Sequence, residues 1–110
     1  GWSDHLITAL GTVEYYDKLT AADPDADEYS RLYMLPGTLH CAGGPGPDRA
    51  DWLEAIRAWV EDGKAPERLV SLQLNENGSM SRTRPVCPYP QVASYRGKGD
   101  PDDEASFACK

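Results

Sequence analysis

The sequence lacks any apolar run that approaches the ~20 residues of a membrane-spanning helix, and it has little positive charge. Eleven Lys and Arg residues stand against 18 Asp and Glu, which gives a net charge of −7 at pH 7. Because nucleic acids and anionic membrane surfaces repel such a chain, we expect neither of them as a partner. Three Trp and six Tyr are present, so the composition is not that of a disordered protein.

The chain also lacks an initiating Met and the charged and apolar regions of a secretory signal peptide. Its 110 residues are enough for one small domain. The opening Gly1-Trp2-Ser3-Asp4 is typical of the interior of a longer sequence. We therefore expect these residues to be a piece of a larger protein.

The cysteines are few and odd in number, and none of them forms a C-x-x-C pair, which argues against a structural zinc site. Cys87 lies in a Pro-rich, loop-like segment and Cys109 lies one residue from the end. We expect these two to form a disulfide that closes a loop of about twenty residues. Cys41 would then bond to a cysteine elsewhere in a longer chain. Three reduced thiols in a cytosolic protein are the alternative that the spacing leaves open.

Alternating helix and strand signals predict an α/β fold. Hydrophobic spacing, turn residues and Pro-Gly breaks divide the chain into a helix over 6–22, an acidic loop over 23–28, a buried strand over 29–35, a Gly- and Pro-rich loop over 36–48, a helix over 48–62 that ends at Gly63, a strand over 69–74, a turn over 75–78, a return strand over 79–84 and an irregular tail from 85. A strand, a helix and another strand in succession are typical of a parallel sheet. Two strands are too few for a stable parallel sheet, so we expect the fold to be incomplete on its own.

His40 follows the predicted strand over 29–35, and Asp4 stands just before the first predicted helix, where a preceding strand would end. Because the carboxyl ends of neighbouring parallel strands open into the same crevice, we expect the two side chains to meet there. A carboxylate that accepts a hydrogen bond from the imidazole fixes its tautomer, and the other ring nitrogen can then act as a general base. In α/β-hydrolases a Ser, an Asp and a His follow one another along the chain, and these residues would be the last two.

Each of these residues also has a structural interpretation. An Asp ahead of a helix is most often an N-cap, a His after a strand is more often structural than catalytic, and we expect His5 at the surface. No serine lies in a G-x-S-x-G context, so a serine nucleophile would come from outside these 110 residues. The acidic run 23–28 has no EF-hand pattern, and the Gly- and Pro-rich loop lacks the features of a phosphate-binding loop.

Four segments carry a resemblance to a known family. They are Gly1-Trp2-Ser3-Asp4 with Leu6-Ile7, then Leu35-Pro36-Gly37 through His40-Cys41 to Gly43-Gly44-Pro45-Gly46-Pro47, then Asp51-Trp52-Leu53 through Trp59-Val60-Glu61 to Gly63-Lys64-Ala65-Pro66, and finally Arg82-Thr83-Arg84-Pro85 through Cys87-Pro88-Tyr89-Pro90 to Phe107 and Cys109. With these segments the chain resembles the C-terminal part of the tannase and feruloyl esterase family, α/β-hydrolases that cleave aromatic carboxylic esters.

The resemblance implies the C-terminal portion of an α/β-hydrolase fold. Residues 1–84 would carry the Asp and His segments, and residues 85–110 would form a tail stapled by Cys87 and Cys109. Asp4 would be the triad acid, His40 the general base, and Cys41 would form a disulfide to a cysteine beside the nucleophilic serine. A tail disulfide favours a secreted or periplasmic protein. No cofactor is expected in this chain, whereas calcium could bind in the family's lid domain, which would precede it.

Two functions from different classes follow as hypotheses. The first is a serine esterase that acts on feruloyl, galloyl or related aromatic esters. In it, this chain supplies Asp4 and His40 to an N-terminal part of the same protein, which carries the serine and the cysteine partner of Cys41. The second is a non-catalytic, hydrolase-like module with a binding or structural role. Under either hypothesis we expect these 110 residues alone to have no esterase activity.

Overall fold

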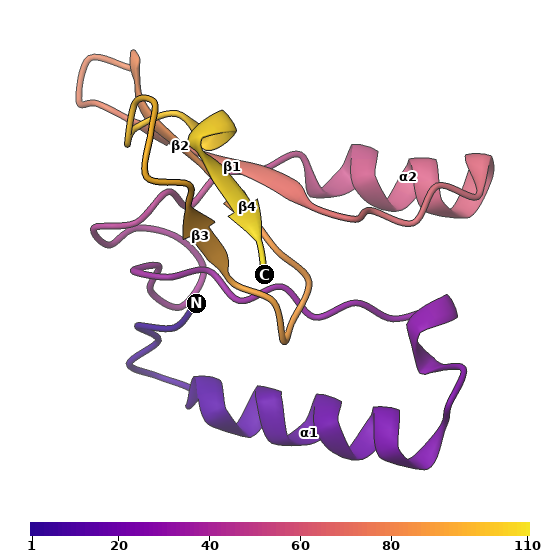
Figure 1. Ribbon diagram of the computed structural model, residues 1–110. Coiled ribbons are helices and arrows are strands. Elements are labelled where there is room, and N and C mark those ends of the chain that lie inside the picture. Colours follow the sequence, from indigo (N-terminus) through magenta and orange to yellow (C-terminus); the bar gives the residue numbers. More distant parts are fainter.

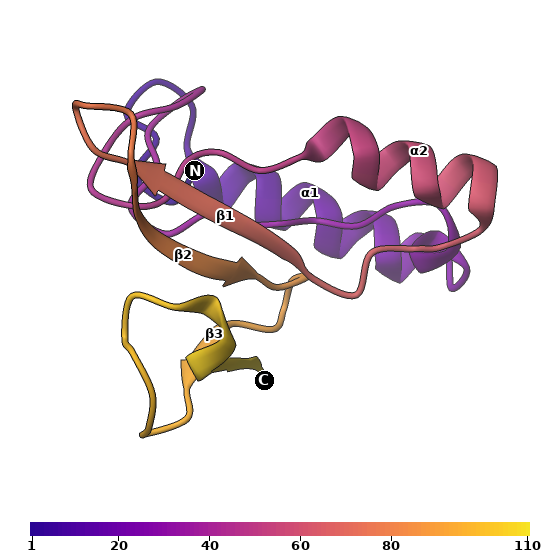
Figure 2. The same cartoon turned by 90° about the horizontal axis from the view of Figure 1, so that it is seen from above.

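The computed structural model describes residues 1–110 as two helices and two small antiparallel sheets joined by long loops (Figure 1). In chain order the elements are α1 (Ala9–Ala22), the 3-10 turn η1 (Ala26–Glu28), α2 (Trp52–Asp62), β1 (Leu69–Leu74), β2 (Met80–Val86), β3 (Ala93–Tyr95), the 3-10 turn η2 (Glu104–Ser106) and β4 (Phe107–Cys109). β1 pairs with β2, and β3 pairs with β4. Seen from above, the β1–β2 hairpin lies between the two helices and the C-terminal tail (Figure 2).

The first helix begins at Ala9, three residues later than the hydrophobic spacing predicts. The delay has a local cause, because Asp4 ties the preceding backbone into a turn. Its Oδ1 accepts the N–H groups of Leu6 at 2.8 Å and of Ile7 at 2.9 Å. Asp4 therefore caps a turn ahead of α1, while the residue next to the helix itself is Thr8.

The predicted strand over 29–35 does not join a sheet, and this part of the prediction is wrong for the present chain. The segment is extended but forms only an isolated bridge between Tyr33 and Pro88, with the Tyr89 N–H donating to the Leu32 carbonyl at 2.7 Å. No second strand pairs with its other edge. The parallel sheet expected from the alternation is consequently absent here, and both sheets are antiparallel pairs.

Helix α2 is bounded by the residues that its sequence predicts, although it begins at Trp52 and not near residue 48. The Asp51 side chain accepts the Glu54 N–H at 3.0 Å, which is an N-cap contact. Gly63 ends the helix in the left-handed conformation, with φ of 66°. The start is shifted because Arg49 leaves the helix path to exchange two backbone hydrogen bonds with Leu72 of β1.

The β1–β2 hairpin confirms the predicted strand over 69–74 and the turn over 75–78. The Asn75 N–H donates to the Ser79 carbonyl at 2.8 Å, and Gly78 occupies the positive-φ position of the turn. The return strand is longer than predicted and continues to Val86. Pro85 is accommodated in it because a strand of a two-stranded sheet has a free edge that needs no N–H donor.

The tail from residue 85 is more ordered than the sequence predicts. Two short strands, β3 and β4, pair through the registers Ala93↔Cys109, Ser94↔Ala108 and Tyr95↔Phe107. An ion pair ties this unit to the hairpin, with Arg68 Nη2 lying 2.6 Å from Glu104 Oε2. Strands of three residues leave too short a hydrophobic pattern to be recognised among the surrounding Pro, Gly and Asp.

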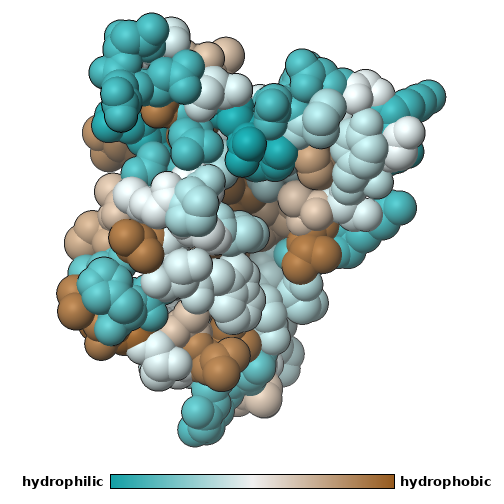
Figure 3. All heavy atoms as spheres, turned by 90° about the vertical axis from the view of Figure 1, so that its left-hand side faces the viewer, coloured by the Kyte–Doolittle hydropathy of each residue, from teal (hydrophilic) through white to brown (hydrophobic).

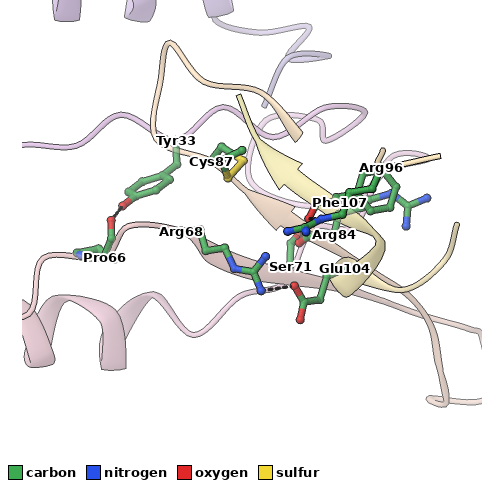
Figure 4. The surroundings of a disulfide bond; sticks show 10 residues. Tyr33, Pro66, Arg68, Ser71, Arg84, Cys87, Arg96, Glu104 and Phe107 are labelled. Atoms are coloured by element: carbon green, nitrogen blue, oxygen red, sulfur yellow. Dashed lines mark hydrogen bonds and ion pairs between the residues drawn. A yellow bond between two sulfur atoms is a disulfide. The ribbon is translucent and has the colours of Figure 1, made fainter. Parts of the chain in front are cut away.

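A disulfide joins Cys87, just after β2, to Cys109 at the end of β4, with a Cα–Cα distance of 5.6 Å. The bond is well covered, since Cys87 is only 5% exposed. Beside it the guanidinium of Arg84 lies 4.5 Å from the centroid of the Phe107 ring (Figure 4). The covalent bond and this cation–π contact both fasten the tail to β2.

Buried residues are few and are concentrated away from the helices. Only nine of 110 residues are buried, and no large side chain is fully buried. The nine are Ala26, Thr38, Gly46, Pro47, Ser71, Pro85, Val86, Cys87 and Ser106. Most of them lie where the loop 36–48 meets β2 and the tail. Large apolar side chains on both helices are exposed instead, among them Leu10 and Leu53. Figure 3 shows apolar residues scattered among polar ones on the face that lies at the left of Figure 1.

Replacing Cys87 and Cys109 together by Ser is expected to free the tail. In the chain-entropy account, loss of a loop closure of this length costs about 3 kcal/mol, so local opening of β3 and β4 becomes about 100-fold more frequent. Hydrogen exchange of the amides in Ala93–Tyr95 and Phe107–Cys109 measures this opening. Cys41→Ser is the matched control, because Cys41 lies outside the tail and is not bonded to it. Unchanged exchange in the double variant would contradict the prediction.

Candidate active site

The carboxylate of Asp4 uses its two oxygens for different partners. Oδ1 holds the backbone turn of residues 4–7, and Oδ2 lies 2.9 Å from Nδ1 of the His40 imidazole. The side chain of Asp4 is only 10% exposed, whereas that of His40 is 36% exposed. The two residues predicted to meet are thus in hydrogen-bond contact, and the imidazole faces solvent beyond the carboxylate.

This contact fixes which nitrogen of the His40 ring carries the proton. A carboxylate accepts hydrogen bonds, so the neutral imidazole places its proton on Nδ1 and donates it to Asp4. The Nε2 atom is then an unprotonated acceptor, and no group of this chain hydrogen-bonds to it. Such a nitrogen can remove a proton from an incoming hydroxyl group, while the carboxylate stabilises the imidazolium that forms.

Backbone hydrogen bonds hold the Asp4 segment against the His40 segment. The Trp2 N–H donates to the Leu35 carbonyl at 2.9 Å, and the Ser3 N–H donates to the Thr38 carbonyl at 3.1 Å. The N-terminal residues therefore lie beside the loop that follows the extended segment 31–35 (Figure 1). These two contacts bring Asp4 and His40 together, which the ends of neighbouring parallel strands were predicted to do.

The loop 36–48 is closed on itself by short-range contacts around His40. The Gly46 N–H donates to the Gly37 carbonyl at 3.2 Å, and the buried Thr38 hydroxyl donates to the Pro47 carbonyl at 3.3 Å. The two arms of the loop pass so closely that a Cβ on Gly46 would collide with the Pro36 carbonyl oxygen. The glycines predicted to shape this loop are required by that close approach of backbone to backbone.

An inner turn carries His40 at its tip. The Leu39 N–H donates to the Gly43 carbonyl at 2.9 Å, so residues 39–43 form a small closed turn. The Gly43 N–H in turn donates to Oδ2 of Asp48 at 2.6 Å. Nothing in the sequence marks Asp48 as part of the site, because its contact depends on the path of the glycine-rich backbone and on no recognisable motif.

The electrostatics of Asp4 keep its carboxyl group ionised. Hydrogen bonds from the backbone N–H groups of Ile7 and Leu6 are the largest influence and hold its pKa far below the ordinary value of 3.8, and the hydrogen bond with His40 lowers it further. Burial opposes these effects but does not outweigh them. The acceptor beside the imidazole is thus a permanent negative charge at any physiological pH.

The other residues singled out in the sequence are placed as follows. Cys41 is exposed and unbonded within the chain, next to His40, whereas Cys87 and Cys109 are joined to each other. His5 is exposed and lies outside the Asp4–His40 contact. No group of three or more His, Cys, Asp or Glu side chains is arranged to hold a metal ion, and neither helix has the length and apolarity needed to cross a membrane.

Comparison with known proteins shows which family this chain resembles. A family model described as tannase and feruloyl esterase matches residues 1–110. Mono(2-hydroxyethyl) terephthalate hydrolase of Piscinibacter sakaiensis is 49% identical over 111 residues, and the match covers 99% of this chain and 18% of that protein. A probable feruloyl esterase of Arthroderma benhamiae is 34% identical over 115 residues, with 99% of this chain and 21% of that protein covered.

Solved structures of related proteins share the fold of this chain. The crystal structure of feruloyl esterase B from Aspergillus oryzae superimposes with a TM-score of 0.89 at 26% identity, over 100% of this chain and 25% of that one. A tannin acyl hydrolase from Aspergillus niger matches with a TM-score of 0.73 at 22% identity, over 97% of this chain and 21% of that one, which shows the shared fold alone.

The fold is therefore that of one part of a hydrolase domain found in esterases. The chain belongs to the tannase and feruloyl esterase family. It spans about a fifth to a quarter of the length of the relatives described above.

The His40→Ala variant is expected to keep a strongly lowered pKa at Asp4, because the Ile7 and Leu6 N–H groups contribute most to the lowering and remain in place. The carboxylate's contribution to stability is complete above the unfolded-state pKa of about 3.9 and is lost only as the pH falls through the lower folded-state pKa. A ¹³C NMR titration of the Asp4 carboxyl group measures its pKa in the variant, with the unsubstituted protein as reference. A midpoint that returns to the ordinary value would show that the imidazole dominates.

Proposed function

We propose that this chain supplies the acid and the base of a serine carboxylic ester hydrolase, and that the serine lies in a part of the protein outside these residues. The observation that carries the proposal is the 2.9 Å contact between Asp4 Oδ2 and His40 Nδ1, with Nε2 left free at the surface. The same arrangement of carboxylate, imidazole and hydroxyl defines the catalytic triad on several unrelated folds. Membership of an esterase family supports the assignment of the reaction class.

In the proposed mechanism His40 moves protons and Asp4 holds it in place. Nε2 takes the proton of the serine hydroxyl as its oxygen attacks the ester carbonyl, and a tetrahedral intermediate forms. The imidazolium gives that proton to the leaving alcohol, which leaves an acyl-enzyme. His40 then removes a proton from water, the water attacks the acyl group, and the acid departs as the proton returns to the serine oxygen. Oxyanion donors would come from the part that bears the serine.

The serine is placed elsewhere because none in this chain suits the role. The chain has seven serines, at positions 3, 30, 71, 79, 81, 94 and 106, and none lies in a G-x-S-x-G sequence. None of them hydrogen-bonds to the His40 ring either. The matches cover only 18% and 21% of two relatives, so those proteins are roughly five times as long and have room for a segment that carries the nucleophile.

We infer aromatic carboxylic esters as the substrate class. The relatives' names support this, since one is a hydrolase of a terephthalate monoester and others are feruloyl esterases. Both names describe esters of an aromatic or cinnamic-type acid. The tail disulfide supports an oxidising compartment, so we place the protein outside the cytosol, secreted or periplasmic.

Cys41 supports a second link to the missing part. It is exposed, adjacent to His40, and the other two cysteines are already joined. We propose that it forms a disulfide to a cysteine beside the serine, so that the covalent bond holds nucleophile and base together. The exposed apolar faces of α1 and α2 would pack against that same part of the domain.

Replacing His40 by Ala in the full-length protein is expected to lower kcat for a feruloyl or galloyl ester by about 10⁴-fold or more, because the proton acceptor is removed. Steady-state hydrolysis of methyl ferulate and methyl gallate measures the loss. His5→Ala is the matched control, as the other histidine lies in the same region and outside the contact. Undiminished hydrolysis in His40→Ala would leave the non-catalytic module as the better description.

Peptide mapping of the unreduced full-length protein is expected to find Cys41 in a disulfide with a cysteine outside these 110 residues. The Cys41→Ser variant should lose thermal stability and kcat together, because the bond constrains both the fold and the site. The double replacement of Cys87 and Cys109 serves for comparison and should affect stability far more than kcat. Recovery of Cys41 as a free, alkylated thiol from the native protein would refute the link.

A further inference from the structure

The carboxylate of Asp48 lies at the end of the loop that carries His40, and the catalytic proposal gives it no role. Its Oδ2 accepts the Gly43 N–H at 2.6 Å, a charge-assisted hydrogen bond. None of the ion pairs in the structure involves Asp48, so its charge is not neutralised by a Lys or Arg. Its side chain therefore acts on the loop backbone.

One side of Asp48 is anchored to the β1–β2 hairpin. The next residue, Arg49, donates its N–H to the Leu72 carbonyl at 3.2 Å and accepts the Leu72 N–H at 2.7 Å. This pair of hydrogen bonds is an antiparallel bridge to the middle of β1. The backbone that bears the Asp48 carboxylate is consequently fixed to the longest sheet in the chain.

The other side of the contact leads directly to His40. The Gly43 N–H donates to the Asp48 carboxylate, and the Gly43 carbonyl accepts the Leu39 N–H at 2.9 Å. Leu39 is the residue before His40, so the turn of residues 39–43 is held at its base by these two bonds. The side chains at the tip, His40 and Cys41, are exposed and have little packing of their own to fix them.

We propose that Asp48 is a positioning residue that orients His40 through Gly43, an inference that rests on the proposed function. The hydrogen bond transmits the rigidity of β1 to the turn of residues 39–43 and keeps the imidazole aligned with Asp4 and with the incoming hydroxyl. Without it the turn gains freedom, and a misplacement of the order of 1 Å at a catalytic group lowers the rate by up to about 10²-fold. The effect is therefore expected in kcat and not in KM.

The chain offers a matched control for this role. Asp51 is the same residue type, lies three positions further along and also accepts one backbone N–H, that of Glu54 at 3.0 Å. Its contact caps α2 and does not lead to His40. Loss of either contact removes a carboxylate and a backbone hydrogen bond, so only the connection to the imidazole distinguishes the two positions.

The experiment compares four variants of the full-length protein, which are Asp48→Ala, Asp48→Asn, Asp51→Ala and His40→Ala. The readouts are kcat and KM for methyl ferulate, thermal unfolding, and hydrogen exchange at the Gly43 amide. We expect Asp48→Ala to lower kcat 10- to 100-fold with KM within twofold. Asp48→Asn, which keeps an acceptor oxygen at the same place, should stay within a few-fold of the unsubstituted protein. Asp51→Ala should lower the unfolding temperature and keep its kcat.

The outcomes separate the two proposals. A fully active His40→Ala variant overturns the catalytic assignment. If His40→Ala is inactive, three results overturn the positioning role alone. They are an unchanged kcat in Asp48→Ala, an equal loss of kcat in Asp48→Ala and Asp48→Asn, and an equal loss of kcat in Asp51→Ala. Should Asp48→Ala fail to fold, the kcat of Asp48→Asn and amide exchange in the unsubstituted protein still test the role, because positioning requires both an acceptor at this place and a formed hydrogen bond. Slow exchange of the Gly43 amide, which becomes fast where the acceptor is lost, supports the hydrogen bond, and fast exchange in the unsubstituted protein overturns it.

Discussion

The division of the Asp4 carboxylate between two partners is the constraint on which the site depends. One oxygen is occupied by backbone N–H groups and the other by the imidazole. The backbone contacts lower the pKa of the Asp4 carboxyl group, which favours a negative charge beside His40. The same contacts restrict the orientation of the carboxylate, because Oδ1 is held by two N–H groups and Oδ2 is thereby directed toward His40. Asp4 thus caps the turn ahead of α1 and not the helix itself, and this turn holds the carboxylate where the proposed catalytic role would need it.

The meeting of Asp4 and His40 could be predicted from the sequence, but the reason for it was only partly right. The prediction relied on two neighbouring parallel strands, and in this chain the segment 29–35 has no strand beside it. The contact forms because Trp2 and Ser3 hydrogen-bond directly to the backbone of the extended segment and of the loop that follows it. These contacts depend on backbone direction, which periodicity does not report. Helix α2 was predictable for the opposite reason, since Asp51, its apolar face and Gly63 are local signals.

The features that the sequence did not predict have one physical property in common. They depend on contacts that the local sequence pattern does not report. The tail strands are too short to show a pattern and are organised by the Cys87–Cys109 bond. The contact of Asp48 with Gly43 exists only because glycines let the two arms of the loop approach. The cysteine positions did indicate the disulfide, because a Pro-rich segment and a chain end gain most from a covalent closure. The register it imposes on β3 and β4 was not accessible in the same way.

The distribution of buried residues separates the part of this chain that positions Asp4 and His40 from the helices, whose apolar side chains are exposed. The buried residues gather where the His40 loop meets β2 and the disulfide-bonded tail, whereas neither helix contains a buried residue. The buried contacts are therefore concentrated around the His40 loop, and the chain makes them with itself. In the proposed enzyme the helices, with exposed residues such as Leu10, Leu53 and Val60, would supply the surface against which the serine-bearing part packs. Such a separation would let short hydrogen bonds set the Asp4–His40 geometry, while an apolar interface would bring the proposed nucleophile to it.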